Sequence, residues 1–126
     1  MTVLVDTSVL IDYLRGHAGA AELLELARAS QVLHASEITR VEILAGTRTQ
    51  EEAPTRLLLS TLAWHDVDAV VAEQAGVLGR QWLPSHPGID GADLAIAATA
   101  ILIGAELLTL NVRHFPMFPE LRRPYR

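Results

Sequence analysis

Side chains that could bind a metal ion occur at four well-separated points of this chain. They are Asp6, Glu42, Asp93 and the pair Asn111 and His114, and each lies beside residues of the type that fill protein cores. Aspartate and glutamate are rarely buried unless they are paired or bind a metal. Four such points flanked by apolar residues therefore predict one cluster that holds a divalent cation.

Each of these carboxylates also has a purely structural interpretation. Asp6 could cap the helix that follows it. Glu42 stands three residues after a threonine, which is the spacing of a capping box, and Asp90 and Asp93 have the same relation to each other. Capping does not explain why the flanking residues are so apolar. Capping also does not explain segment 109–115, in which a strand ends in polar residues and a phenylalanine follows.

Strand-like and helix-like segments alternate along the chain and would position these residues. Strands are expected over 2–5, 32–35, 64–67 and 106–110, and helices over 8–14, 19–30, a segment ending at Gly46, 50–62, 68–83 and 90–104. This order predicts a three-layer α/β/α sandwich with a mostly parallel central sheet, as a single domain over residues 1–126. Strand ends and helix starts meet at one edge of such a sheet, so the four points would come together there.

Composition narrows the class of protein. The chain has 126 residues, of which 50 % are hydrophobic and 20 % are charged, as expected for a globular domain. Because it has no cysteine, it can form neither disulfides nor thiolate zinc sites. The longest apolar run, 94–104, is far shorter than the roughly 20 residues of a membrane helix, and Met1 leads directly into a strand. We therefore expect a soluble cytoplasmic protein with no membrane contact.

Charge excludes some functions and leaves others open. The net charge of −5 argues against a nucleic-acid binder that relies on bulk positive charge. Bound Mg²⁺ would reverse the local field at an acidic site, so a nuclease remains possible. All ten basic residues are arginines, which excludes any chemistry that needs a lysine ammonium group. Residues 6–16 lack the glycine pattern of a P-loop or a dinucleotide-binding fold.

Four segments resemble the PIN-domain family and, within it, the VapC ribonuclease toxins of bacterial type II toxin–antitoxin pairs. They are VDTSVLIDYL, TRVEILAG, DLAIAATAILIGAELLTLNVRHF and the tail of aromatic residues and prolines. The first three acids of the family fall on Asp6, Glu42 and Asp93. The small hydroxyl residue beside the first acid falls on Ser8. The resemblance spans nearly the whole chain, in the right order and spacing.

The fourth acidic position of the family departs from the pattern. Asn111 and His114 stand where many relatives carry aspartate or glutamate. An asparagine carbonyl suits a hard cation, whereas histidine suits Mn²⁺ better than Mg²⁺. A second metal site is therefore open to question. Asp90, one helical turn before Asp93, could compensate, and His114 could instead contact a phosphate or the leaving group.

The resemblance implies an endoribonuclease that depends on Mg²⁺ or Mn²⁺. Such an ion would polarise the phosphate and activate a water molecule. We assign Asp6 and Asp93 as direct ligands and Glu42 as a ligand or as the group that orients a metal-bound water. Ser8 and Asn111 would complete the site through oxygen contacts or hydrogen bonds.

Three arginines are the candidate contacts to substrate. Arg15, Arg40 and Arg113 stand near the motif residues and could hold RNA phosphates, although each could equally be a solvated or ion-paired arginine. The resemblance implies a homodimer, a cognate VapB-like antitoxin and a structured RNA target such as tRNA. The alternative function is a catalytically weak PIN-like module that binds RNA or a protein without cleaving it.

Overall fold

Four short parallel strands form the centre of the molecule. In the computed structural model, which describes residues 1–126, the strands are β1 (Thr2–Val5), β2 (Leu33–Ser36), β3 (Ala63–His65) and β4 (Ala105–Leu108). Their order in the sheet is β3-β2-β1-β4, and every neighbouring pair is parallel. The predicted α/β fold with a mostly parallel sheet is confirmed.

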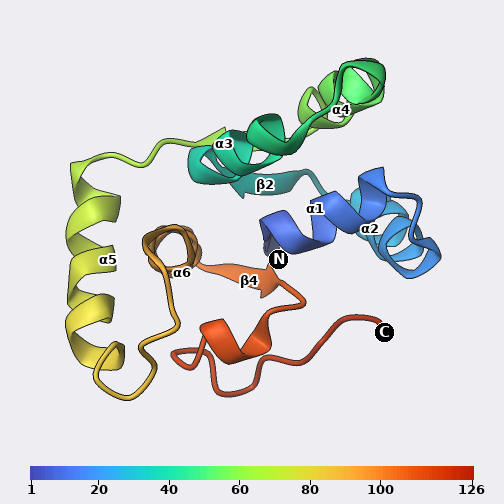
Figure 1. Ribbon diagram of the computed structural model, residues 1–126. Helices are drawn as coiled ribbons and strands as arrows, with labels where there is room; N and C mark the ends of the chain where they lie inside the picture. The colour runs from blue at the N-terminus through green and yellow to red at the C-terminus, as the bar shows by residue number, and fades with distance from the viewer.

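Six helices cover the two faces of this sheet (Figure 1). The helices are α1 (Thr7–Leu14), α2 (Ala18–Ser30), α3 (Glu37–Gly46), α4 (Glu52–Leu59), α5 (Ala69–Trp82) and α6 (Gly91–Ile103). Two short 3₁₀ turns, η1 (Thr49–Glu51) and η2 (Val112–His114), complete the chain. None of the helices is both long enough and apolar enough to cross a bilayer.

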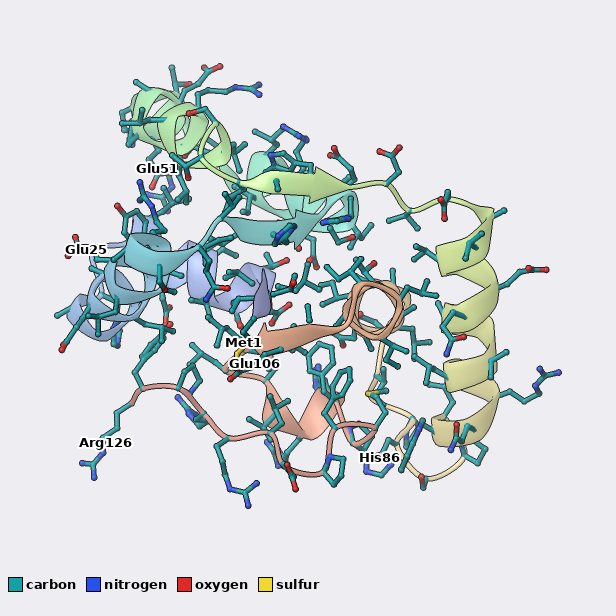
Figure 2. All side chains as sticks on the ribbon, turned by 180° about the vertical axis from the view of Figure 1, so that it is seen from behind. Met1, Glu25, Glu51, His86, Glu106 and Arg126 are labelled. Atoms are coloured by element: carbon teal, nitrogen blue, oxygen red, sulfur yellow. The ribbon has the colours of Figure 1, made fainter.

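Each face of the sheet has its own hydrophobic core. Strand side chains point alternately to the two faces, so Leu4 and Leu107 pack with α5 and α6 on one side. Val3, Val5 and Leu33 pack with α1, α2 and α4 on the other. Strands buried on both faces are apolar at nearly every position, which is why the β1 sequence TVLV shows no alternation. Figure 2 shows the side chains that fill both spaces from behind.

Most element boundaries agree with the expectations, and the exceptions have local causes. The expected helix 50–62 begins as the 3₁₀ turn η1 and ends at Leu59, and the expected strand 64–67 is Ala63–His65. The expected strand 106–110 ends at Leu108. Beyond that point the Thr109 hydroxyl bonds to Asp6, so the segment leaves the sheet as its side chains enter the site.

The C-terminal tail is fixed against the first two helices. The Tyr125 hydroxyl donates a hydrogen bond to Asp12 Oδ2 over 3.0 Å, and its ring centroid lies 4.9 Å from that of His17. A Cβ atom on Gly19 would lie only 3.0 Å from the Tyr125 ring, so the absence of a side chain on Gly19 makes room for the tail. Burial, together with the bond to Asp12, raises the pKa of Tyr125. Its hydroxyl therefore remains protonated and can donate.

Candidate active site

Asp6 is the first polar residue after β1 and is almost fully buried, with 2 % of its surface exposed. Its backbone N–H donates to the Leu108 carbonyl over 2.8 Å, which joins the ends of β1 and β4. Asp6 Oδ2 accepts hydrogen bonds from the hydroxyls of Ser8, at 2.8 Å, and Thr109, at 2.7 Å. Asp6 occupies the N-cap position of α1, yet its side chain caps nothing. The capping interpretation of Asp6 is therefore wrong.

The second oxygen of Asp6 is free for a ligand. Both side-chain hydrogen bonds end on Oδ2, and no basic side chain lies within 4 Å of the carboxylate, because the ion pairs are formed by other residues. Asp6 Oδ1 has no hydrogen-bond partner in the protein. It is nevertheless absent from the fully buried polar atoms without a partner, of which Gln31 Oε1 is the only one. Asp6 Oδ1 is therefore in contact with solvent. A buried carboxylate with no counter-charge is the kind of oxygen donor that a hard cation binds.

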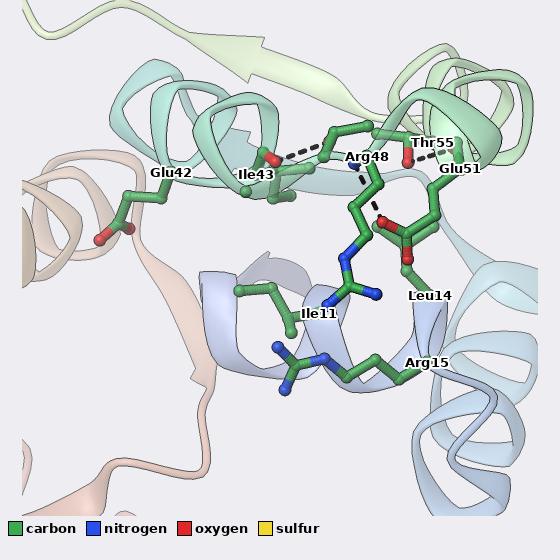
Figure 3. Close-up of a pocket in the computed structure, with 10 residues that line it drawn as sticks. Ile11, Leu14, Arg15, Glu42, Ile43, Arg48, Glu51 and Thr55 are labelled. Carbon is green, nitrogen blue, oxygen red and sulfur yellow. Dashed lines mark hydrogen bonds between the residues drawn. The ribbon is translucent and has the colours of Figure 1, made fainter.

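Glu42 is held by a hydroxyl from the start of α1. It lies in the middle of α3, exposed to solvent, and its Oε1 accepts a hydrogen bond from Thr7 over 2.6 Å. Thr7 Oγ1 also lies 2.9 Å from the Thr39 hydroxyl. The cap of α3 is Ser36, whose hydroxyl accepts a bond from the Ile38 N–H. Glu42 is thus no capping residue, and its carboxylate is oriented toward α6 and β4 (Figure 3).

Asp93 has both a structural and a site-facing role. Asp90 caps α6 by accepting the Asp93 N–H over 2.8 Å, and Asp93 Oδ2 accepts the Asp90 N–H in return, so the capping box is real. The same Oδ2 lies 2.9 Å from His114 Nδ1. Burial raises the pKa of Asp93 to about 6, and the Asp90 charge adds to this, while the Asp90 N–H and His114 oppose it.

The segment after β4 ties these groups together. The Leu110 N–H donates to Ser8 Oγ over 3.2 Å, and the Asn111 N–H donates to Thr109 Oγ1 over 3.0 Å. The Asn111 side chain has no hydrogen bond within the protein. Thr109 was not a predicted site residue. Its position could have indicated its role. Thr109 is a hydroxyl residue that directly follows an apolar strand, much as Ser8 closely follows β1.

The predicted residues come together in three groups rather than in one closed ligand set. Asp6 pairs with Ser8, Glu42 with Thr7, and Asp93 with Asp90 and His114. No three aspartate, glutamate or histidine side chains lie close enough to hold a metal ion between them. Like-charged carboxylates repel one another, and each of these is held by donors of its own.

The three arginines expected to contact substrate differ in their surroundings. Arg40 is paired with Glu37 and its guanidinium lies 4.0 Å from the centre of the Trp64 ring, so it is already engaged. Arg113 lies in η2 and Arg15 follows α1, and neither forms an ion pair. Arg15 borders the same pocket as Glu42.

Comparisons with known proteins agree with this geometry. The family model of the PIN domain matches residues 3–120. The chain is 48 % identical to Ribonuclease VapC19 of Mycobacterium tuberculosis, over 97 % of this chain and 98 % of that protein. It is 39 % identical to Ribonuclease VapC10 of the same organism, over 98 % of this chain and 92 % of that protein.

Solved structures show the same similarity. A toxin–antitoxin complex from Klebsiella pneumoniae contains a chain that superposes with a TM-score of 0.82, at 30 % identity and with 99 % of both chains covered. VapBC2 from Rickettsia felis, bound to a DNA fragment from its promoter, superposes with a TM-score of 0.79, at 27 % identity and with 96 % of both chains covered. The chain therefore belongs to the PIN-domain family, among its VapC-type ribonucleases.

Proposed function

We propose that the protein is a metal-dependent endoribonuclease that acts as the toxin of a VapBC-type pair. The observation that carries this proposal is Asp6, a buried carboxylate at the carboxyl edge of the sheet, oriented by two hydroxyls and lacking any counter-charge. A group in that condition suits a cation better than it suits any structural role in the fold. The similarity to VapC ribonucleases over almost the whole chain supports the same activity.

The side chains present fit Mg²⁺ or Mn²⁺ in their chemistry. All candidate ligands except His114 are hard oxygen donors, and Mg²⁺ needs only one or two carboxylates beside its waters. Asp6 and Asp93 would hold the ion, and Glu42 would bind it or orient one of its waters. When bound, such an ion activates water and stabilises the charge of the phosphate. Ser8 and Thr109 keep Asp6 in place, while Asn111 supplies a neutral amide at the position where the family pattern has an acid.

RNA is the proposed substrate, with structured RNA such as tRNA as the expected class. The similarity to chains of toxin–antitoxin complexes supports a VapB-like antitoxin as the partner. We also propose a homodimer in the cytoplasm as the working form. The alternative is a catalytically weak module that binds without cutting. It is favoured by one observation, the replacement of the fourth acid by Asn111 and His114.

The decisive experiment measures RNA cleavage by the purified protein. The wild type and the variants Asp6→Asn, Asp93→Asn and Asp66→Asn are incubated with total RNA in Mg²⁺, Mn²⁺ or EDTA, and new RNA ends are sequenced. Asp66 is an exposed loop residue and provides a matched control. We expect recurring cuts for the wild type and Asp66→Asn, none in EDTA, and a loss of roughly 100-fold or more for the other two variants.

Circular dichroism of each variant confirms that it is folded. If Asp6→Asn and Asp93→Asn cut RNA as fast as Asp66→Asn does, the proposed metal site is wrong. If the wild type binds RNA but produces no cuts with any divalent ion, the binding module replaces the enzyme.

A further inference from the structure

A pocket beside Glu42 contains two arginines that have no acidic partner. It lies between α1 and the segment from α3 to α4, has a volume of about 260 Å³, and is bordered by Arg15, Arg48 and Glu42. Figure 3 shows the Arg15 and Arg48 guanidinium groups directed into the same gap, with Glu42 farther along α3. Arg48 was not among the arginines that the sequence suggested for substrate binding.

Neither guanidinium forms an ion pair within the protein. The ion pairs of the chain are Arg40 with Glu37 and His114 with Asp93, so no carboxylate lies within 4 Å of Arg15 or Arg48. Glu51 also borders the pocket, but its Oε1 accepts the backbone N–H of Arg48 over 3.0 Å. That bond fixes the main chain of Arg48 at the start of η1. The pocket lining thus holds two arginines and two glutamates, Glu42 and Glu51, but neither glutamate forms an ion pair with Arg15 or Arg48. The two guanidinium charges repel each other, and an anion bound between them would relieve that repulsion.

We propose that Arg15 and Arg48 form the binding site for the RNA phosphate next to the one that is cut. This inference rests on the proposed ribonuclease function. Guanidinium groups bind phosphate oxygens through two parallel hydrogen bonds, which makes arginine well suited to this contact. The site would also offset the repulsion that the acidic side chains and the net charge of −5 exert on RNA.

The position of the pocket favours a nucleic acid over an acidic peptide. Glu42, which Thr7 orients toward α6 and β4, borders the pocket on the side of the candidate active site. Phosphates recur at every nucleotide of an RNA strand. We infer that a strand with one phosphate at Asp6 and Asp93 brings a neighbouring phosphate to the pocket that Glu42 borders, whereas a peptide has no backbone phosphates. Arg40 does not border this pocket, and its guanidinium is paired with Glu37.

The test measures binding of a fluorescein-labelled single-stranded RNA of mixed sequence by fluorescence anisotropy, over a range of salt concentrations. Arg15→Gln, Arg48→Gln and the double variant are made in the Asp6→Asn background so that the RNA stays intact. Arg80→Gln, which removes one exposed arginine from α5, is the matched control. Phosphate contacts are independent of sequence, so the natural target is not needed.

We expect roughly tenfold weaker binding for each single variant, because each loses a charged hydrogen bond. The slope of log K against log salt is negative, and we expect its magnitude to decrease by roughly 0.7 for each lost contact. The decrease in the double variant should therefore be roughly 1.4. Arg80→Gln should change neither quantity. The proposal is overturned if the double variant binds RNA with the affinity and slope of Arg80→Gln.

Two further outcomes separate this site from the proposed function. The first compares RNA cleavage by the wild type and by the double variant with Asp6 intact. If both cut RNA with the same KM, the phosphate site is refuted and the proposed ribonuclease function is retained. If the wild type cuts no RNA but the double variant loses RNA binding, the ribonuclease function is refuted and the phosphate site is retained. If the double variant loses affinity for poly-glutamate but not for RNA, the pocket serves a protein partner and the proposal fails.

Discussion

His114 Nδ1 lies 2.9 Å from Asp93 Oδ2, the oxygen of Asp93 that faces both η2 and the start of α6. The family pattern places an acid at this point, and the imidazole has a different consequence. It donates to the carboxylate or, when protonated, neutralises it, so it competes with a divalent cation for the same oxygen. The chain thus contains a built-in competitor at a proposed ligand.

Replacing this competitor with an acid should tighten metal binding. In His114→Asp a second carboxylate stands beside Asp93, which destabilises the protein in EDTA through repulsion and attracts Mg²⁺ more strongly. We expect Mg²⁺ affinity to rise by roughly tenfold or more, or about 1.4 kcal/mol, as measured by isothermal titration calorimetry. His86→Asp, in the loop after α5 (Figure 2), makes the same substitution at a histidine that forms no ion pair with Asp93. Equal Mg²⁺ affinities for the two variants would place the ion elsewhere.

Asp93 should also make stability depend on pH. Burial raises its pKa from an ordinary value of 3.8 to about 6 in the folded protein. Because the folded state binds this proton more readily than the unfolded chain does, the ionised form destabilises the fold above pH 6, and the penalty disappears as the pH falls toward 4. Between pH 7.5 and pH 5 the change is about 1 kcal/mol in favour of folding. Urea unfolding in EDTA measures it, and the increment should be absent in Asp93→Asn.

The buried hydroxyl of Thr109 should stabilise the fold, because the buried Asp6 carboxylate loses a hydrogen-bond donor without it. Thr109→Val keeps the shape but removes both the donor to Asp6 Oδ2 and the acceptor of the Asn111 N–H, which leaves a buried carboxylate less satisfied. We expect a loss of about 1–3 kcal/mol in the free energy of unfolding. Thr109→Ser retains the hydroxyl and should lie close to wild type. A valine variant as stable as the serine variant would show that Asp6 does not depend on Thr109.

Two glycines should respond oppositely to alanine. Gly104 ends α6 with a φ of +66°, a conformation that costs an alanine about 1 kcal/mol. Gly76 lies within α5, and a Cβ atom there would meet nothing within 4 Å, so alanine should add roughly 0.5–1 kcal/mol of stability. Thermal unfolding should therefore shift downward for Gly104→Ala and upward for Gly76→Ala. Shifts of the same sign would contradict the backbone argument.

The fold was predictable because its signals are local. Apolar runs, glycines and capping residues mark each strand and helix, and the capping box of Asp90 and Asp93 could be read from spacing alone. The pairing of Arg40 with Glu37 was also present in the sequence, since residues three apart meet on a helix. For Arg40, the ion-paired alternative that the sequence left open is the one that the structure shows.

Contacts between distant strands and helices could not be predicted in this way. The bond from Thr109 to Asp6 joins residues 103 positions apart and depends on the register of β1 against β4. His34 and His65, whose ring nitrogens lie 2.8 Å apart, meet only because β2 and β3 are neighbours. No spacing rule anticipates such pairs. For the same reason the sequence did not reveal that Arg15 and Arg48 share a pocket.

The anchoring of Tyr125 on Asp12 and Gly19 has a practical meaning for anyone who prepares this protein. An affinity tag or reporter fused after Arg126 would disturb Tyr125, which contacts both α1 and α2. Arg15 lies in the connection between these two helices. A handle placed ahead of Met1, which is 90 % exposed, avoids that disturbance. Binding data from the two kinds of fusion should not be pooled.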